Sequence, residues 1–369
     1  MQFHASEKTR YARQQLLPDI GELGQMHLRN ARVLCIGAGG LGSPLLLYLA
    51  AAGVGTIGIV DHDIVELSNL HRQIIFNSED VGTKKVSAAK NRIHALNPHI
   101  EVLSYEDKIS RANAESIIAS FDIIADGTDN FNARYIINDA CFRLKKPNVS
   151  ASIFQFEGQC SIFTDDNGPC YRCLYPDMPS SQWMPNCAES GVLGVLPGIL
   201  GTIQATEVLK WILKIGNSLK NRLLTVDARE MQFREFQIEK NPHCILCGEN
   251  ASRENLIDSL IDREEQCMNA VIPEISIQEL KALQDKGEEF VLLDVREPSE
   301  YAECEMGGKL IPIGELAARV SELDPTKKTI VHCRGGGRSK RGVEILKNAG
   351  FHDARNLTGG ITAWLKTFP

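Results

Sequence analysis

Residues 33–60 read VLCIGAGGLGSPLLLYLAAAGVGTIGIV, and this stretch decides the fold of the N-terminal part of the chain. It contains no charged side chain and exceeds the ~18 apolar residues that indicate a membrane-spanning helix. Seven glycines and Pro44 interrupt it, however, and divide it into a strand at 33–36, a glycine-rich turn, a helix that ends near Ala52 and a strand at 56–60. This order is typical of a buried βαβ unit, so we expect no membrane span.

The glycine-rich turn at 37–42, GAGGLG, matches the G-x-G-x-x-G pattern and lies between a strand and a helix, as this pattern requires. Glycines let the backbone approach phosphate groups, and the start of the helix offers unpaired N–H groups to an anion. Asp61 ends the following strand, where a carboxylate usually binds ribose hydroxyls. We therefore expect a nucleotide here, with Gly39, Gly40 and Gly42 at its phosphates; a turn with only a packing role is the alternative.

Polar side chains after Asp61 favour a nucleoside triphosphate over NAD. Arg72 and Lys85 would neutralise charge on phosphoryl oxygens, and Asp129 would hold Mg²⁺. Hydride transfer requires none of these groups, although each of them taken alone is more often a solvated surface charge. The candidate nucleotide-binding residues are Gly39, Gly40, Gly42, Asp61, Ser68, Asn69, Leu70, His71, Arg72, Lys85, Asp129 and Asn130.

The eleven cysteines do not indicate a disulfide framework, because the cytosol keeps thiols reduced and an odd number cannot pair completely. Two C-x-x-C pairs, Cys170 with Cys173 and Cys244 with Cys247, would present four thiolates to one tetrahedral ion, which is typical of structural zinc. A thioredoxin-like redox pair is the alternative, but it would leave the second pair without a role. Cys187 lies between the pairs in a stretch rich in proline and glycine, as a candidate nucleophile or an inert thiol.

A second unit follows a charged, asparagine-rich stretch at 249–271, which we interpret as a linker. Strands are expected at 290–293 and 329–332, and Cys333 follows the second of them in the sequence CRGGGR. The N–H groups of the glycines and the start of a helix at 339–348 should stabilise its thiolate. Four nearby cations should add to this effect: Arg334, Arg338, Lys340 and Arg341. A stabilised thiolate suits sulfur transfer through a persulfide or phosphate-ester hydrolysis; a purely structural cysteine is the alternative.

The length of 369 residues suggests two domains or more, and the formal charge of −7 excludes a protein that coats nucleic acid. Short apolar runs at 33–36, 56–60, 101–105, 122–125 and 148–151 alternate with helical stretches, which predicts a doubly wound α/β sheet. The N-terminus lacks the basic and apolar segments of a secretory signal, so we expect a cytoplasmic protein.

Residues 8–248 resemble the ubiquitin-activating-like adenylyltransferases, the family of the enzymes that activate the sulfur carriers of molybdopterin and thiamine synthesis. The resemblance rests on RYARQ at 10–14, the glycine turn, SNLHRQ at 68–73, DGTDN at 126–130 and the two C-x-x-C pairs. It implies a Rossmann-like, doubly wound ATP-binding domain with a structural zinc site at 1–248.

The C-terminal part resembles a single rhodanese domain. This resemblance rests on LDVRE at 293–297, the Cys333 loop, and NLTGG at 356–360 followed by Ala363-Trp364. It implies a smaller α/β rhodanese domain at 272–369, joined to the first domain by the linker at 249–271.

Together the two resemblances imply ATP-dependent adenylation of the C-terminal glycine of a small β-grasp sulfur carrier that ends in Gly-Gly. Arg72 and Asp129 would act on Mg-ATP, and Arg13 would reach into the site of a second protomer, which implies a homodimer. Cys333 would carry a persulfide, and Cys187 would form or resolve an acyl-disulfide on the way to a thiocarboxylate. These five residues are the candidate catalytic residues.

The C-terminal unit follows the sulfurtransferase pattern in the length of its cysteine loop, but it departs from the rhodanese pattern after the Glu-Tyr pair. Cys333 and Arg338 enclose four residues, as in sulfurtransferases, whereas related phosphatases enclose five. Many rhodanese domains have Gly-His-Ile-Pro-Gly-Ala after the Glu-Tyr pair, but here Cys304 and Glu305 follow, and an acidic side chain replaces the usual histidine.

Several alternatives stay open at this point. The sulfur donor is a cysteine desulfurase persulfide or thiosulfate, and the pathway is that of molybdopterin, thiamine, cysteine or tRNA thiolation. Activation of another carboxylate, with the rhodanese unit as a docking module, is a rival function. A protein that senses ATP without turnover is a second rival.

Overall fold

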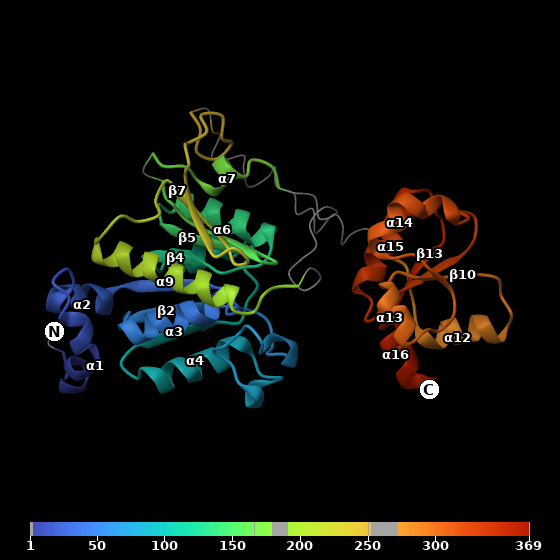
Figure 1. Cartoon of the computed structure of the whole chain (residues 1–369), viewed down its shortest axis with the longest axis horizontal. Helices are drawn as coiled ribbons and strands as arrows, with labels where there is room; N and C mark the ends of the chain where they lie inside the picture. The colour runs from blue at the N-terminus through green and yellow to red at the C-terminus, as the bar shows by residue number, and fades with distance from the viewer. Residues whose placement is uncertain (1–2, 166, 179–190, 250, 252–271, 369) are drawn as a thin grey trace. The chain divides into compact units, whose positions relative to one another are not determined.

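The chain divides into two compact units, Met1–Ile257 and Asp258–Pro369, and each is described separately (Figure 1). The computed structural model describes residues 3–165, 167–178, 191–249, 251 and 272–368. The boundary between the units, Cys187 and nearly all of the expected linker lie outside the described residues, so the expected domain ends remain a prediction.

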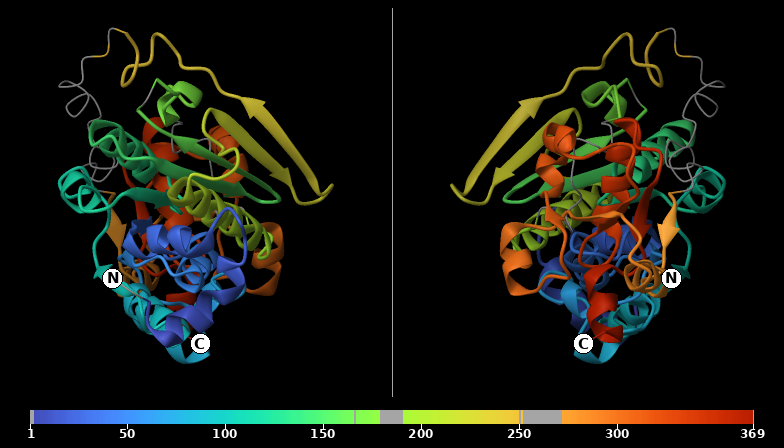
Figure 2. Two further views of the ribbon diagram at one scale, coloured as in Figure 1. Left: turned by 90° about the vertical axis from the view of Figure 1, so that its left-hand side faces the viewer. Right: turned by 90° about the vertical axis from the view of Figure 1, so that its right-hand side faces the viewer.

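The N-terminal unit is built on an eight-stranded mixed sheet with the order β3-β2-β1-β4-β5-β6-β7-β8. The strands from β3 to β5 in this order pair in parallel, and those from β5 to β8, green and yellow in Figure 2, pair antiparallel. The order reverses between β1 and β4, which is where such sheets bind ligands. The strands are β1 Arg32–Ile36, β2 Thr56–Val60, β3 Glu101–Tyr105, β4 Ile123–Asp126, β5 Asn148–Phe154, β6 Glu157–Phe163, β7 Arg222–Asp227 and β8 Gln232–Gln237.

The parallel strands lie where the apolar runs predict them, and the doubly wound α/β fold is confirmed. β2 and β3 have the predicted ends, β4 lies one residue later than predicted, and β5 continues three residues further. The sequence analysis did not find β6, β7 and β8. Every residue of β8 is exposed, so no apolar run marks this edge strand.

Helices cover both faces of this sheet. Val33 and Cys35 of β1 pack with α3, α4 and α9 on one face, while Leu34 and Ile36 pack with α5 and α6 on the other. This alternation follows the two-residue period of a strand. The helices are α1 Ala5–Gln15, α2 Gly21–Asn30, α3 Gly42–Ala52, α4 Lys85–Leu96, α5 Ala114–Ile118, α6 Phe131–Arg143, α7 Tyr171–Leu174 and α9 Leu196–Leu213, with 3₁₀ turns η1 Leu67–Asn69 and η2 Ser78–Asp80.

The end of α3 holds α1 in place. Gly53 terminates α3 in a left-handed conformation with φ 84°, and a Cβ at this position would lie 2.5 Å from the ring of Tyr11. Tyr11 lies on α1 and is buried, and its hydroxyl accepts a hydrogen bond of 2.8 Å from Nδ2 of Asn97. The helix that carries Arg13 is therefore packed firmly on the sheet domain.

The C-terminal unit is built on a five-stranded parallel sheet with the order β11-β10-β12-β13-β9. Apolar clusters lie on both faces of it, as the α/β prediction requires. Its elements are β9 Glu274–Ile275, α12 Ile277–Asp285, β10 Val291–Asp294, α13 Pro298–Glu303, β11 Lys309–Leu310, α14 Ile313–Arg319, η3 Val320–Glu322, β12 Thr329–His332, α15 Gly337–Asn348, β13 Ala354–Leu357 and α16 Gly360–Thr367. In the described part of the chain, no helix is both long enough and apolar enough to cross a membrane.

Candidate functional site

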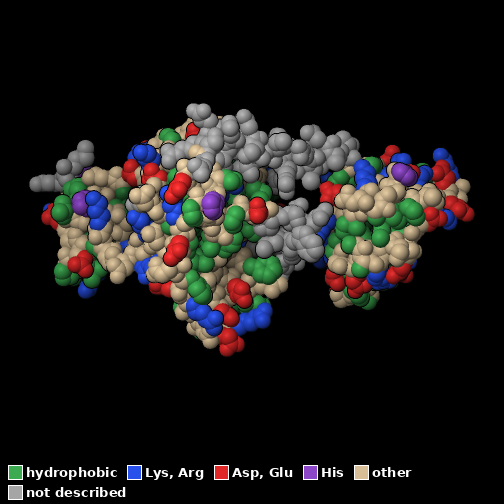
Figure 3. Space-filling model, turned by 90° about the horizontal axis from the view of Figure 1, so that it is seen from above, with side chains coloured by type: hydrophobic (Ala, Val, Ile, Leu, Met, Phe, Trp, Pro, Cys, Tyr) green, Lys and Arg blue, Asp and Glu red, His purple; other side chains and the backbone are tan. Residues whose placement is uncertain are grey.

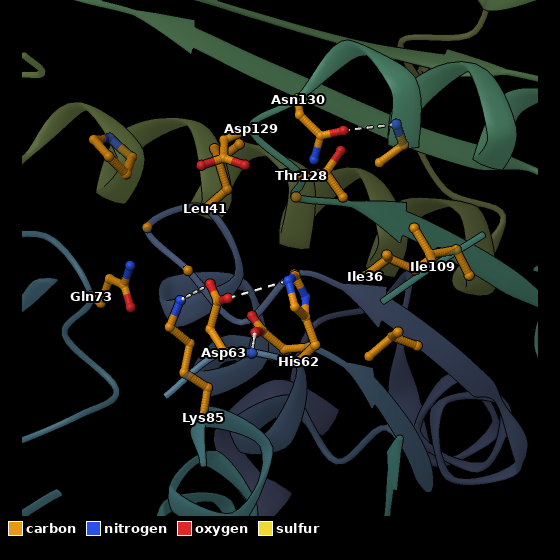
Figure 4. Close-up of a pocket in the computed structure, with 18 of the residues that line it drawn as sticks. Ile36, Leu41, His62, Asp63, Gln73, Lys85, Ile109, Thr128, Asp129 and Asn130 are labelled. Carbon is orange, nitrogen blue, oxygen red and sulfur yellow. Dashed lines mark hydrogen bonds and ion pairs between the residues drawn. The ribbon is translucent and has the colours of Figure 1, made fainter. Parts of the chain in front are cut away.

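A cleft opens at the carboxyl ends of β1, β2 and β4, beside the reversal of the strand order (Figure 4). Parallel strands bring the residues that follow them to this one edge, which is why segments far apart in the sequence meet here. The polar and glycine residues that line it include Gly37, Gly39, Gly40, Asp61, His62, Asp63, Arg72, Gln73, Lys85, Lys108, Thr128, Asp129, Asn130 and Arg134.

The glycine turn forms one wall of the cleft. Gly37 has φ 93°, and a Cβ on Gly42 would lie 2.0 Å from the carbonyl oxygen of Gly37. Asp61 supports the turn from the next strand, because its Oδ2 accepts a hydrogen bond of 2.8 Å from the Ala38 N–H. Gly39 and Gly40 therefore line the cleft, whereas Gly42 lies beneath the turn and allows it to close on the start of α3.

Lys85 reaches the cleft from the first residue of α4. Its side chain is 7% exposed, and its Nζ donates to Oδ2 of Asp63 over 2.8 Å, as Figure 4 shows. Partial burial raises the pKa of Asp63, but the bond and the charge of Lys85 outweigh this effect and lower the pKa below its ordinary value. Asp63 therefore stays charged and holds the ammonium group at the cleft. The sequence analysis missed Asp63, although it lies only two residues after Asp61.

The opposite wall comes from the segment between β4 and α6. Asp126 is buried, and burial raises the pKa of its carboxyl; it accepts from the backbone N–H and the hydroxyl of Thr128 at 3.0 and 2.7 Å. Arg134 donates to the Thr128 carbonyl over 2.8 Å. These bonds fix the segment, so that Asp129 lines the cleft and the Asn130 side chain caps α6 by accepting from the Ala133 N–H.

The structure places the remaining predicted residues at the margin of the cleft or away from it. Ser68, Leu70 and His71 do not line it; they lie in or just after η1, next to Arg72, which does. Asn69 is buried, and its Oδ1 accepts from the Glu66 N–H over 3.2 Å, so it shapes the turn that presents Arg72. Gln73, Thr128, Lys108 and Arg134 are lining residues that sequence reasoning missed. The first two lie within the stretches that marked the site.

Arg13 does not line this cleft. It lies on α1, where its side chain is exposed. In the described part of the chain, the cleft is lined by residues from position 36 onward.

The two C-x-x-C pairs meet in space. The four Sγ atoms lie within 4.8 Å of one another, with separations of 4.0 Å for Cys170 and Cys173, 3.6 Å for Cys170 and Cys244, and 3.2 Å for Cys173 and Cys247. Four sulfurs in a tetrahedron at ~2.3 Å from zinc would lie ~3.8 Å apart, so the spacing fits this ion. Leu246 is buried among these sulfurs, which favours a closed, structural zinc site over a redox pair.

Cys333 lies at the start of the loop between β12 and α15. The residue is 2% exposed, the Gly336 N–H donates to its Sγ over 3.1 Å, and the Ser339 hydroxyl lies 3.3 Å from the same sulfur. A Cβ on Gly360 would lie 2.3 Å from the Cys333 carbonyl oxygen, which in turn accepts from the Ile361 N–H. The glycines at 359 and 360 therefore let the start of α16 support the cysteine loop.

Carboxylates neutralise two of the four cations expected to stabilise the Cys333 thiolate. Arg338 binds Glu300 through both of its Nη atoms, at 2.6 and 2.7 Å, and Lys340 lies 3.1 Å from Glu274. The expectation is therefore corrected for Arg338 and Lys340, whose charges are paired, and it stays a prediction for Arg334 and Arg341. The sequence did not reveal these pairs because their carboxylates come from other elements.

Comparisons with known proteins agree with this geometry. The model of the ThiF family matches residues 11–246. The chain belongs to the ThiF family. Residues 276–367 match the model of the rhodanese-like domain, so the family resemblance inferred from the motifs is confirmed for both parts.

Several relatives of this ThiF-family chain match it over nearly its whole length. It is 42% identical to the probable adenylyltransferase/sulfurtransferase MoeZ of Mycobacterium tuberculosis, over 98% of this chain and 93% of that protein. It is 39% identical to the adenylyltransferase and sulfurtransferase MOCS3 of Arabidopsis thaliana, over 96% and 82%. The sulfur carrier protein adenylyltransferase of Thermus thermophilus is 45% identical over 70% of this chain and 97% of its own length. The chain is therefore an adenylyltransferase and a sulfurtransferase.

A solved structure shares the fold of part of the chain. The crystal structure of E. coli MccB with ATP aligns with 64% of this chain and 74% of its own, with a TM-score of 0.58 and 23% identity. At this identity the likeness shows the fold alone.

Proposed function

We propose that this enzyme adenylates the C-terminal glycine of a small ubiquitin-like sulfur carrier in the cytosol and then passes sulfur to it from Cys333. The observation that carries the proposal is that one chain holds a nucleotide-type cleft with Arg72, Lys85 and Asp129 and, in its rhodanese-like unit, a buried thiol held by N–H and O–H donors. The relatives that combine both units are named for both activities.

The cleft supports the first half of the reaction. ATP would place its ribose at Asp61 and its phosphates at the glycine turn, within reach of Arg72 and Lys85. A carboxylate oxygen of the carrier attacks the α-phosphorus, and pyrophosphate leaves with the electron pair of the broken bond. The two cations would stabilise the charge that develops on the phosphoryl oxygens. Asp129 would hold Mg²⁺, which supplies further charge neutralisation when bound.

The second half would use Cys333 and Cys187. The terminal sulfur of a Cys333 persulfide attacks the acyl carbon of the adenylate and displaces AMP. The thiolate of Cys187 then attacks the Cys333 sulfur, which releases the carrier thiocarboxylate and leaves a disulfide between the two cysteines for an external thiol to reduce. Cys187 lies outside the described residues, so its part rests on the family resemblance.

We propose that the active form is a homodimer in which Arg13 completes the site of the partner. Arg13 is exposed on a firmly packed helix and does not line its own cleft. Hydrophobic side chains reach the surface of the N-terminal unit (Figure 3). Leu16, which directly follows α1, and Leu23 on α2 are 75% and 70% exposed. In such a dimer these two leucines would be covered together with the helix that carries Arg13.

The decisive experiment measures carrier-dependent exchange of labelled pyrophosphate into ATP with a panel of carriers that end in Gly-Gly. We expect exchange with one carrier, loss of exchange in Asp129→Ala, and normal exchange without thiocarboxylate in Cys333→Ser. No exchange with any carrier, while ATP still binds, would contradict the proposal. Thiocarboxylate formation by Cys333→Ser would contradict the role of the cysteine.

A further inference from the structure

The last residue of the cysteine loop is held by a carboxylate from another helix. Both Nη atoms of Arg338 donate to the two Oε atoms of Glu300 on α13, at 2.6 and 2.7 Å, and each side chain is about a quarter exposed. Glu300 is itself fixed: its Oε2 accepts from the Glu297 N–H over 3.1 Å, and its carbonyl oxygen accepts from Nη1 of Arg296 over 3.1 Å. Arg296 is anchored by Asp294 in the core.

Arg338 lies close enough to Cys333 for their charges to interact, so the pair with Glu300 changes the charge that a donor meets at the sulfur. The bond to Arg338 lowers the pKa of Glu300 to about 2, so at neutral pH the carboxylate is ionised and the pair has no net charge. The Cys333 sulfur is otherwise held by the neutral Gly336 N–H and by the Ser339 hydroxyl, whose single proton is also shared with Oδ1 of Asn356 at 2.7 Å. Arg334 and Arg341 belong to the same segment and act on a donor alike in the wild type and in a Glu300 variant, so the charge of Arg338 is the part that Glu300 controls.

The two classes of sulfur donor differ in the charge of the group that leaves when they give up their outer sulfur. Thiosulfate is a dianion: the Cys333 thiolate attacks its outer sulfur, the S–S bond breaks, and sulfite leaves as a dianion with the electron pair. A hydropersulfide R–S–SH reacts at its outer sulfur in the same way, but it releases only the monoanion R–S⁻. A free guanidinium beside the sulfur would favour the dianion more strongly than the monoanion.

We infer that Glu300 is a specificity-determining residue of the sulfurtransferase site, because by pairing with Arg338 it disfavours thiosulfate relative to hydropersulfide donors. This inference rests on the proposed function, in which Cys333 accepts sulfur. Glu300 acts indirectly, by holding Arg338 in place and offsetting its charge, and we do not assign it a contact with the reacting sulfur.

The test uses the full-length protein and the substitution Glu300→Gln, which keeps an acceptor for the Glu297 N–H but removes the charge. The rate constant for persulfide formation on Cys333 is measured by mass spectrometry with thiosulfate and with cysteine hydropersulfide. We expect the rate constant for thiosulfate to rise roughly tenfold and that for the hydropersulfide to change less than about twofold.

Two further variants separate charge from loop structure. Glu315→Gln removes the exposed pair of Glu315 with Arg319 on α14 and should leave the donor ratio unchanged. The double variant Glu300→Gln/Arg338→Gln removes both charges and should return the ratio to that of the wild type.

The outcomes are distinguishable. An unchanged donor ratio in Glu300→Gln, or a ratio that the double variant does not restore, would overturn the inference while leaving sulfur transfer to Cys333 intact. If wild-type Cys333 forms no persulfide with either donor, the proposed sulfur transfer fails, and this inference fails with it.

Discussion

Arg172 lies between the first pair of zinc-site cysteines, and its replacement by methionine should strongly destabilise the N-terminal unit. Its Nε and Nη2 donate to the two carboxylate oxygens of Asp139 on α6, at 2.8 and 2.7 Å, and its guanidinium stacks 4.6 Å from the centre of the Tyr135 ring. The side chains of Arg172 and Asp139 are only 1% and 7% exposed. This bond connects the segment of the metal site to the core.

The expected loss of stability in Arg172→Met follows from the burial of the Asp139 carboxylate, which would be left without its partner. Removing one partner of a buried ion pair costs about 3–5 kcal/mol, because the other charge loses both its partner and water. Arg143 offers a matched control on the same helix as Asp139, since it pairs with Glu115 where the two side chains are 25% and 46% exposed. An exposed pair of this kind contributes at most about 1 kcal/mol, so Arg143→Met should have a small effect.

The assay is urea unfolding followed by tryptophan fluorescence in a Trp364→Phe background, which removes the tryptophan of the C-terminal unit. The zinc content of each sample is measured in parallel. We expect Arg172→Met to lower the free energy of unfolding by about 3–5 kcal/mol, and the additional change Asp139→Asn to recover more than half of this loss. A loss no larger than that of Arg143→Met would refute the reasoning.

Two further predictions concern pH and the glycine turn. Burial lowers the pKa of His332 from 6.5 to about 4 in the folded unit. Between these two pH values the imidazole binds a proton in the unfolded chain but not in the folded unit. The C-terminal unit should therefore lose stability as the pH falls from 6.5 towards 4. Thermal unfolding at several pH values checks this, and a His332→Leu variant that keeps the same slope would contradict it. Gly42→Ala should reduce ATP–pyrophosphate exchange by more than roughly tenfold, because the added methyl group would lie 2.0 Å from the Gly37 carbonyl oxygen. Gly198→Ala, where the methyl group meets nothing within 4 Å, should keep normal exchange; equal losses in both variants would count against a local effect.

Local patterns in the sequence were sufficient for the parallel strands of the first sheet and for β10 and β12 of the second, whereas β9, β11 and β13 were missed. Short apolar runs predicted β2, β3 and β12 with the ends that the structure shows. The start of α12 also carries a local signal, because Ser276 and Glu279 form a capping box there. These elements depend on burial and on hydrogen bonds within a few residues, which a sequence displays directly. The exposed strand β8 depends on pairing with β7, which lacks any such signal.

The residues of the candidate site also fall into two groups, those that local sequence patterns revealed and those that they did not. The glycine turn, Asp61 and Asp129 were found from the sequence because each lies within three residues of the end of an apolar strand. Asp63 and Arg134 were missed, because their roles depend on Lys85 and on the Thr128 carbonyl, which reach them from other segments.

The sequence by itself determined the two α/β units, the glycine turn, the two cysteine pairs and the cradled cysteine, because glycine conformation, strand burial and cysteine spacing are properties of short segments. Only the tertiary structure decided how charge is distributed at the sites. Glu300 neutralises Arg338, and Asp139 holds Arg172, across gaps of more than thirty residues in the chain. Electrostatic interactions depend on distance in space and on burial, and folding sets both.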